Sequence, residues 1–398
     1  MTARLARLGE VATLQAGVGF PVDLQGRNFG DYPLAKVGDI SRGGRSGNSI
    51  LATADHFVDE NDLLRLRSRP VPAGSVLFAK IGEAIRQNHR VVAGRAMMID
   101  NNAMAAIPGP EVASRYLYHF LRTVDLYALA SSTTVPALRK SELVHIRLPL
   151  PALEEQRRIA DILDRADALR VRRREALTLL DDLTQSIFLD MFGEPATNSK
   201  QLEMGIVGEV ADVQGGLQVS SARARLPTKV PYLRVANVHR ERLDLSEIKT
   251  LNATDSEIAR TSLQTGDLLV VEGHGNPNEI GRSALWDGSV SGCVHQNHLI
   301  RVRFDQEIID PQFGAVYLNS SAGRRFLLRS AKTTSGLNTI TTTDVKRTPI
   351  SLPPRHDQRA FAVRLDLVKR TRHENDAQLL WIDELFASLQ QRAFAGLL

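Results

Sequence analysis

Several short segments of this chain concentrate arginine, lysine, asparagine, glutamine and histidine, whose side chains offer paired hydrogen-bonding groups. In the major groove of DNA, Arg or Lys pairs with guanine and Asn or Gln pairs with adenine, so these residue types can read base edges. The candidates in the first half of the chain are Arg42, Arg45, Asn48, Lys80, Arg86, Gln87, Asn88, Arg139 and Lys140. The candidates in the second half are Arg234, Asn237, His239, Arg240, His274, Asn276, Asn278, Lys332, Thr333, Ser335 and Asn338. We expect most of them to lie in loops.

Motifs for catalysis, cofactors or metals are weaker. Gly273-His274-Gly275 lacks the third glycine of a dinucleotide-binding fingerprint, and the chain has no phosphate-binding G-x-x-x-x-G-K-[ST] loop. Cys293, His295 and His298 could ligate zinc, but a fourth ligand is not visible. Asn276-Pro277-Asn278 matches only part of the Asn-Pro-Pro-aromatic motif of amino-methyltransferases. We therefore expect no catalytic residues, no cofactor and no metal, which favours a binding protein over an enzyme.

The net charge of +5 is distributed unevenly along the 398 residues. Residues 1–150 carry +5 and residues 196–353 carry +2, whereas residues 151–195 carry −3 and residues 354–398 carry +1. Positive charge thus lies in the two long segments rather than in the segment that connects them. This distribution is consistent with phosphate contacts made through the long segments.

Two segments carry apolar residues at the alternating three-four spacing of a coiled-coil helix. Neither stripe can remain in water, so we expect the two helices, each about 60 Å long, to pack antiparallel with Arg173 and Asn375 at matching positions. The alternative is that each helix packs on its own globular domain. The first stripe contains Ile159, Ile162, Ala166, Leu169, Arg173, Ala176, Leu180, Leu183 and Ile187. The second contains Phe361, Leu365, Val368, Arg372, Asn375, Leu379, Ile382, Phe386, Leu389 and Ala393.

The chain also repeats itself at a distance of about two hundred residues. Leu8 to Gly17 returns as Val207 to Gly216, and Leu150 to Arg157 returns as Leu352 to Arg359. Within each repeat a short apolar run follows a turn glycine, and a helical pattern comes later. The predicted strands are Ser75 to Ala79 and Asp267 to Val271, and the predicted helical stretches are Ser114 to Leu129 and Pro311 to Arg329. These patterns predict an α+β protein with two pseudo-repeated mixed α/β domains, residues 1–150 and 196–353. Two long helices, residues 151–195 and 354–398, separate the domains and pack as an antiparallel coiled coil.

With this frame the chain resembles the specificity subunit of type I restriction–modification systems. The resemblance rests on the entry into each long helix, which first reads Leu-Pro-Leu-Pro-Ala-Leu-Glu-Glu-Gln-Arg-Arg-Ile from Leu148 to Ile159. The second copy departs from that pattern at Arg355, His356, Asp357 and Phe361.

The resemblance implies a DNA-binding subunit without catalysis of its own, with one target-recognition domain in each repeat. Each domain would read one half of a split duplex site, and the two conserved helices would set the distance between the halves. Two adenine methyltransferase subunits and a nuclease/translocase subunit are the partners that it implies.

Two other interpretations remain open from the residues alone. The first is a single-chain restriction enzyme or methyltransferase, and the second is a coiled-coil scaffold that does not bind DNA. The N-terminus lacks the apolar core of a signal peptide, the chain has no apolar run of about 18 residues, and Cys293 is the single cysteine. We therefore expect a cytoplasmic protein without membrane contact.

Overall fold

The computed structural model describes residues 4–47, 49–131, 134–334 and 337–398. The chain forms two compact units, and each is described by itself. Unit 1 contains Met1–Leu177 with Asn375–Leu398, and unit 2 contains Thr178–Glu374. None of the helices in the described ranges combines the length and the apolar character that a bilayer span requires.

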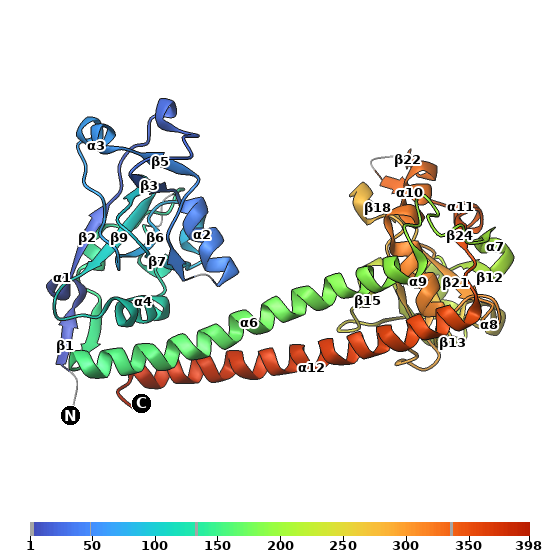
Figure 1. Ribbon diagram of the computed structural model, residues 1–398. Helices are drawn as coiled ribbons and strands as arrows, with labels where there is room; N and C mark the ends of the chain where they lie inside the picture. The colour runs from blue at the N-terminus through green and yellow to red at the C-terminus, as the bar shows by residue number, and fades with distance from the viewer. Residues whose placement is uncertain (1–3, 48, 132–133, 335–336) are drawn as a thin grey trace. The chain divides into compact units, whose positions relative to one another are not determined.

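Unit 1 is built on two small sheets and a short two-stranded ladder (Figure 1). The larger sheet has the order β2 (Ala12–Ala16), β9 (Ala103–Pro108), β6 (Val76–Ala79), β7 (Arg90–Ala93), β4 (Ile50–Leu51). The smaller sheet has the order β5 (His56–Val58), β3 (Tyr32–Ala35), β8 (Met98–Ile99), and the ladder pairs β1 (Arg4–Arg7) with β10 (Arg147–Leu150). The helices are α1 (Leu8–Val11), α2 (Val37–Ser46), α3 (Glu60–Leu66), α4 (Ser114–Thr123) and α5 (Lys140–Leu143), with 3₁₀ turns at Val22–Leu24, Glu83–Ile85 and Tyr127–Leu129.

Unit 2 repeats this arrangement. Its larger sheet has the order β12 (Ala211–Gly215), β21 (Leu299–Phe304), β17 (Leu268–Val271), β19 (Ser283–Leu285), and its three-stranded sheet has β16 (Lys249–Ala253), β13 (Thr228–Leu233), β20 (Val294–His295). The ladder pairs β11 (Met204–Ile206) with β24 (Pro349–Ser351). Unit 2 also contains the sheet β18 (Gly273–His274), β23 (Leu337–Thr339), β22 (Lys332–Thr334) and the pair β14 (Val238–His239), β15 (Arg242–Leu243). Its helices are α7 (Val207–Val210), α8 (Asp255–Thr261), α9 (Pro311–Asn319), α10 (Ser321–Ser330) and α11 (Thr342–Lys346), with 3₁₀ turns at Ser221–Arg225, Val235–Asn237 and Pro277–Glu279.

The predicted repeat is confirmed as a repeat of topology. In each unit the strand after the turn glycine, β6 or β17, lies in the middle of the larger sheet and is buried on both faces. One face of β6 packs on α4, so Val76 and Phe78 join the same apolar cluster as Tyr116 and Leu117. A strand buried on both faces appears in sequence as a continuous apolar run, which is why both runs were recognisable.

The predicted helical stretches after these sheets are interrupted. In unit 1, α4 ends at Thr123 because Val124 takes an extended backbone conformation, and a 3₁₀ turn follows. In unit 2, Ser320 separates α9 from α10, and its hydroxyl accepts a hydrogen bond from the Gly323 amide at 3.3 Å. A serine that caps a new helix is favoured over one that continues the old helix.

The two long helices are α6 (Leu153–Phe192) and α12 (Arg355–Phe394), each of 40 residues. In unit 1, Arg158 of α6 donates to the Leu398 carbonyl at 3.0 Å, whereas Arg173 donates to the Asn375 side chain. As the residue number rises along α6, the number of the C-terminal residue that it contacts falls. The same order holds in unit 2. The helices run antiparallel within each unit, as predicted, and the two polar mid-stripe residues bond to each other.

The contacts within unit 2 follow the same order along both helices. Asp181 forms an ion pair with Arg372, and Phe188 packs edge-to-face with Phe361, with ring centroids 5.7 Å apart.

The apolar face of α6 differs from the predicted stripe. Leu169 and Leu183 are 52% and 40% exposed, whereas Ala160 and Leu163, outside the stripe, are buried. The first half of α6 must cover α4 as well as α12, and in unit 1 α4 lies between the sheet and α6 (Figure 1). The two long helices therefore pack against each other and, at the same time, against the domains.

A buried glutamine anchors the start of each long helix. Gln156 is fully buried, accepts a hydrogen bond from the Ala113 amide at 2.8 Å, and donates to the carbonyls of Glu111 and Pro151 at 2.9 and 2.8 Å. Gln358 does the same in unit 2, accepting from the Asp310 amide at 2.7 Å and donating to two carbonyls. The glutamine that recurs as Gln156 and Gln358 thus has a structural cause.

Replacing Gln156 by Leu should destabilise unit 1 by about 3 kcal/mol, because it strands one amide and two carbonyls away from water. Urea unfolding of the full chain measures this, with the exposed Gln391→Leu on α12 as the matched control. Equal unfolding midpoints for the two variants would contradict the anchoring role.

Candidate nucleic-acid interface

In each unit the structure joins two candidate segments that are far apart in the sequence. In unit 1, Ile81 after β6 bridges to Ala137, and the Leu138 amide donates to the Lys80 carbonyl at 2.9 Å. In unit 2, β18 after β17 pairs with β23, which places His274 opposite Asn338. The two junctions are equivalent because each links the end of the central strand to the loop before α5 or α11. Each unit therefore presents one composite edge made of two loops.

At the edge of unit 1 most of the candidate side chains face solvent. Gln87, Arg139 and Lys140 are exposed. Arg86 is 61% exposed, donates to Glu83 at 2.6 Å and lies over the Tyr127 ring, 4.2 Å from its centroid. A stacked, exposed guanidinium keeps donors available to an incoming group. These contacts fix the position of the Arg86 side chain and still leave part of its guanidinium accessible to another molecule.

Asn88 has a different environment from its neighbours. Its backbone takes the left-handed conformation with φ at 53°. Its side chain donates to the Val124 carbonyl at 3.1 Å and accepts from Arg90 at 2.7 Å. These bonds hold the turn, so the hydrogen-bonding groups of Asn88 are largely used within the unit.

Arg42 and Arg45 lie on helix α2 rather than in the expected loop. Asp39 accepts from the Lys36 amide at 2.8 Å at the start of the helix, and Ile40 is buried. The cap and the burial offset the cost of the helix glycines. Arg42 pairs with Asp39 and Asp55, whereas exposed Arg45 has no ion-pair partner among the described residues. Asn48 lies outside the described residues.

In unit 2 the first candidate group is divided between structural and exposed roles. Asn237 is 3% exposed, accepts from the Arg234 amide at 3.0 Å and donates to the carbonyls of Asp244 and Glu247. Arg234 forms an ion pair with Glu247. His239 is half-buried on β14. Through these hydrogen bonds Asn237 stabilises the turn that contains the neighbouring candidate residues.

Two arginines meet at the second candidate group of unit 2. Arg240 donates to the Asn278 carbonyl at 3.1 Å, and Arg324 of α10 donates to the same oxygen. Asn276 caps the 3₁₀ turn by accepting from the Asn278 amide at 3.0 Å, and His274 accepts from the Asn276 amide at 3.0 Å. Half-buried Arg324 was not among the candidates from the sequence, although two adjacent arginines, Arg324 and exposed Arg325, are a basic signal in their own right.

The remaining candidates lie around β22 and β23. Lys332 and Thr333 are on strand β22 and Asn338 is on β23, whereas Ser335 lies outside the described residues. Strand β23 pairs with β18, and β22 pairs with β23, so this segment forms part of the composite edge of unit 2.

The possible zinc ligands are occupied or buried. His295 is fully buried, with Nδ1 3.1 Å from the Thr261 carbonyl and Nε2 3.3 Å from the Gln214 carbonyl. Burial lowers the pKa of His295 to about 4 and raises the pKa of Cys293 to about 12. A thiol with so high a pKa is a poor metal ligand. Among the described residues no group of three or more acidic, His or Cys side chains is arranged to hold a metal ion.

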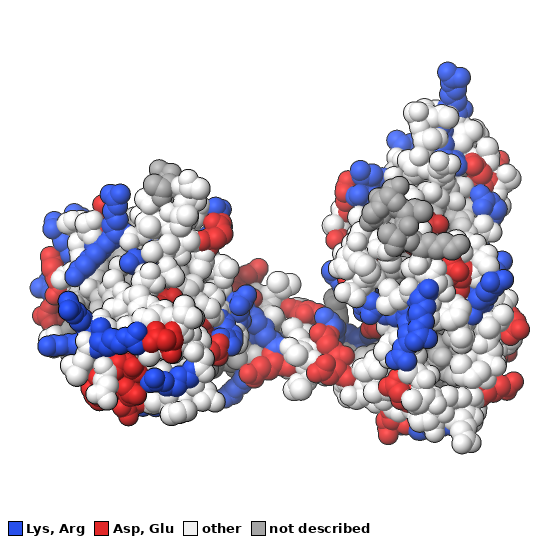
Figure 2. Space-filling view, turned by 90° about the horizontal axis from the view of Figure 1, so that it is seen from above, with Lys and Arg blue, Asp and Glu red and all other residues white. Residues whose placement is uncertain are grey.

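Charged side chains of both signs cover each unit. In Figure 2, Lys and Arg (blue) alternate with Asp and Glu (red) on the visible face of each unit and form no continuous basic surface. The composite edges therefore identify the candidate interface better than the overall charge does.

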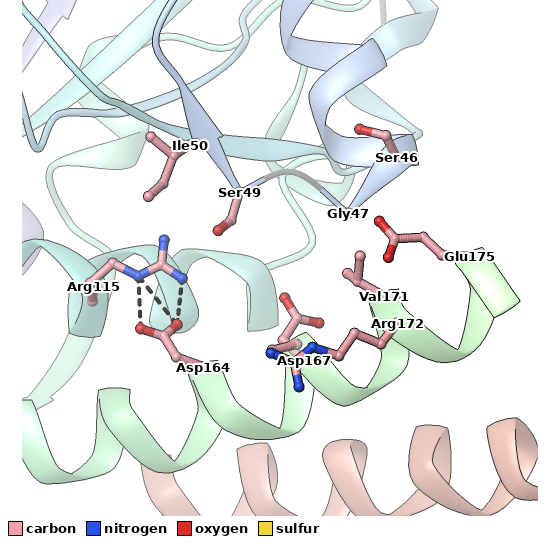
Figure 3. Close-up of a pocket in the computed structure, with 11 residues that line it drawn as sticks. Ser46, Gly47, Ser49, Ile50, Arg115, Asp164, Asp167, Val171, Arg172 and Glu175 are labelled. Atoms are coloured by element: carbon pink, nitrogen blue, oxygen red, sulfur yellow. Dashed lines mark hydrogen bonds and ion pairs between the residues drawn. The ribbon is translucent and has the colours of Figure 1, made fainter.

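One ion-pair cluster fixes α4 of unit 1 on α6. Asp164 of α6 accepts from Arg115 of α4 at 3.0 Å, as the dashed lines in Figure 3 mark, and lies 2.6 Å from Nε2 of His119. Burial alone would raise the pKa of Asp164, but the hydrogen bonds with His119 and Arg115 lower it to about 2. The ionised carboxylate thus stabilises the folded unit.

Asp164→Asn should cost about 2 kcal/mol at pH 7, because the lowered pKa of the carboxyl favours the folded state at every pH above its unfolded value. The difference from the wild type should shrink as the pH falls from about 4 to about 2. Denaturant unfolding at several pH values measures it, with exposed Asp161→Asn as control. If the difference in unfolding free energy between the wild type and Asp164→Asn did not change with pH, the ionised carboxylate of Asp164 would not be its cause.

Comparisons with known proteins agree on one family. Residues 4–179 match the model of the type I restriction modification DNA specificity domain. The EcoKI specificity subunit of Escherichia coli is 23% identical over 424 aligned residues, covering 98% of this chain and 88% of that protein. The StySPI specificity subunit of Salmonella potsdam is 22% identical over 416, with the same two coverages.

Two solved structures share the fold. The S subunit of a type I restriction–modification system from M. genitalium aligns with a TM-score of 0.56 at 13% identity, over 99% of both chains. A chain from a structure of the type I R-M system aligns with a TM-score of 0.58 at 18% identity, over 100% of this chain and 98% of that one.

Proposed function

The chain belongs to the specificity subunits of type I restriction–modification systems, and we propose that each of its units reads one half of a split DNA site. As a member of this family it is a non-catalytic, sequence-specific DNA-binding subunit that assembles with methyltransferase and restriction subunits. Two methyltransferase copies fit a chain with two equivalent units. The single buried Cys293 favours the cytoplasm, where thiols stay reduced.

The observation that carries the proposal is a shared frame with two different edges. Both units share the order of four strands in the larger sheet, to which unit 1 adds β4, and have the same terminal ladder and the same buried glutamine. At the equivalent junction, however, unit 1 has one bridge, Ile81 to Ala137, and unit 2 has the three strands β18, β23 and β22. A common frame with different loops is how one architecture recognises two unrelated sequences.

We assign base and phosphate contacts to the composite edges and to α2. Exposed Arg45, Arg86, Gln87, Arg139 and Lys140 are the leading candidates of unit 1. The leading candidates of unit 2 are His239, Arg240, His274, Asn278 and Asn338. Asn88 and Asn237 support these side chains through their bonds to the backbone. Residues 1–150 and 196–353 are the proposed recognition domains.

Sequencing of modified DNA from cells that carry this chain and its companion methyltransferase tests the proposal. The methylated motif should consist of two specified parts with an unspecified spacer. Arg139→Ala should relax one position in one part only, because a lost base-edge arginine costs about 1–3 kcal/mol. Exposed Arg4→Ala is the charge-matched control. A single continuous motif would contradict the split-site function.

We further propose that α6 and α12 set the spacer. Insertion of one heptad after Leu177 with another after Glu374, where both helices pass between units, preserves the apolar period. Seven residues add about 10 Å, which equals about three base pairs at 3.4 Å each. The methylated motif should then keep both parts and lengthen its spacer by about three base pairs. An unchanged spacer would contradict this role.

A further inference from the structure

Unit 1 buries an arginine that forms no ion pair with any carboxylate of the described residues. Arg90, at the start of β7, is 4% exposed. Its guanidinium donates to the His89 carbonyl at 2.8 Å, to the Asn88 side chain at 2.7 Å and to the Val124 carbonyl at 3.4 Å, and its buried Nε has no hydrogen-bond partner among the described residues. Burial, and after it the charge of Arg122, lowers the pKa of Arg90 to about 9. An uncompensated buried cation is costly, so it calls for an explanation.

The fold itself does not require this cation. Arg90 lies opposite Phe78 in the pairing of β7 with β6. The position of Phe78 in its strand corresponds to that of Val270 in β17, and Val270 lies opposite Ser283. Unit 2 therefore builds the same place in the same sheet with a small neutral side chain, and the arginine belongs to unit 1 alone.

Arg90 lines a cavity of about 220 Å³ that three other arginines also line. Arg122 of α4 and Arg170 of α6 share one carboxylate, Asp167, at 2.8 Å each. The fourth arginine, Arg174, lies 3.2 Å from Asp383 of α12, a residue that also pairs with Arg170. Among the described residues Asp167 is the single acid in the lining, so positive charge exceeds negative charge there.

The size of the cavity limits what it can hold. Pockets for drug-sized molecules start at about 300 Å³, and one water takes about 30 Å³ of liquid, so the cavity suits a group between the two. Tight packing closes one side, since a Cβ on Gly44 would come within 2.6 Å of the His89 ring. Burial, and after it the charge of Arg45 and of Arg90, lowers the pKa of His89, which disfavours the charged imidazolium.

A neighbouring cavity of about 530 Å³ has the opposite balance. It is lined by Arg115 and Arg172 but by three acids of α6, Asp164, Asp167 and Glu175, as Figure 3 shows. Arg115 and Asp164 there already neutralise each other. Only the smaller cavity combines excess positive charge with an unneutralised buried cation.

We propose that the smaller cavity of unit 1 binds one phosphate group, with Arg90 and Arg122 as its principal ligands. Planar guanidinium groups are matched to phosphate oxygens, and the ligand supplies the negative charge that Arg90 lacks. The group is either a backbone phosphate of the bound duplex or inorganic phosphate. With a backbone phosphate the proposal rests on the DNA-binding function above, whereas with inorganic phosphate it does not.

Two measurements on the full chain separate these sources. The first is the affinity for duplexes with and without the methylated motif as a function of KCl concentration. The second is the thermal unfolding temperature in sodium phosphate against sodium chloride at equal ionic strength. The variants are Arg90→Ser, which copies unit 2, and Arg122→Gln, with exposed Arg4→Ser as the charge-matched control. Circular dichroism verifies that each variant folds.

For a backbone phosphate, both cavity variants should lower the slope of log affinity against log salt by about 0.9 on either duplex, and Arg4→Ser should not. For inorganic phosphate, phosphate should raise the unfolding temperature of the wild type but not of the cavity variants, with unchanged salt slopes. If folded variants change neither quantity, the proposal is wrong. Wild-type protein that does not prefer the motif would overturn the DNA-reading function alone and leave the phosphate measurement valid.

Discussion

The structure depends on how the start of each long helix is fixed to its domain. Gln156 and Gln358 each bind one backbone amide and two backbone carbonyls in a dry environment, which sets where the helix begins and in which direction it leaves. Beyond that point the helix must cover its own domain and the other long helix at once. Two apolar surfaces on one helix connect the domain that carries the composite edge to the helix pair.

This constraint leaves the composite edges free to differ. The central strands β6 and β17 are buried on both faces, so their residues are limited to apolar types. The loops that follow them each place one isoleucine, Ile85 or Ile280, in the core, whereas their exposed residues tolerate changes of charge. One edge consequently relies on Arg86 stacked over Tyr127, and the other on the strand pair that places His274 opposite Asn338. Arg90 shows that divergence also reached a buried position.

Local and periodic signals in the residues were enough to predict part of the fold. The α12 stripe from Phe361 to Ala393, the glycine that ends α6 and the repeated strands follow from helix period, capping and apolar runs. The two repeats, and the family resemblance that rests on them, were recognised from the sequence without knowledge of tertiary contacts. The stripe on α6 was only partly right, because a one-dimensional period cannot show that a helix has two partners.

Whether a polar side chain stabilises the fold or remains exposed depends on tertiary contacts. Asn237 and Arg139 are equally suited to read a base, yet one is buried against two carbonyls and the other is exposed. Arg42 and Arg45 lie on a helix because a cap and one buried isoleucine outweigh three glycines. The side-chain type sets which hydrogen bonds are possible. The packing of distant segments sets whether protein or solvent takes them, and that information is not local in the sequence.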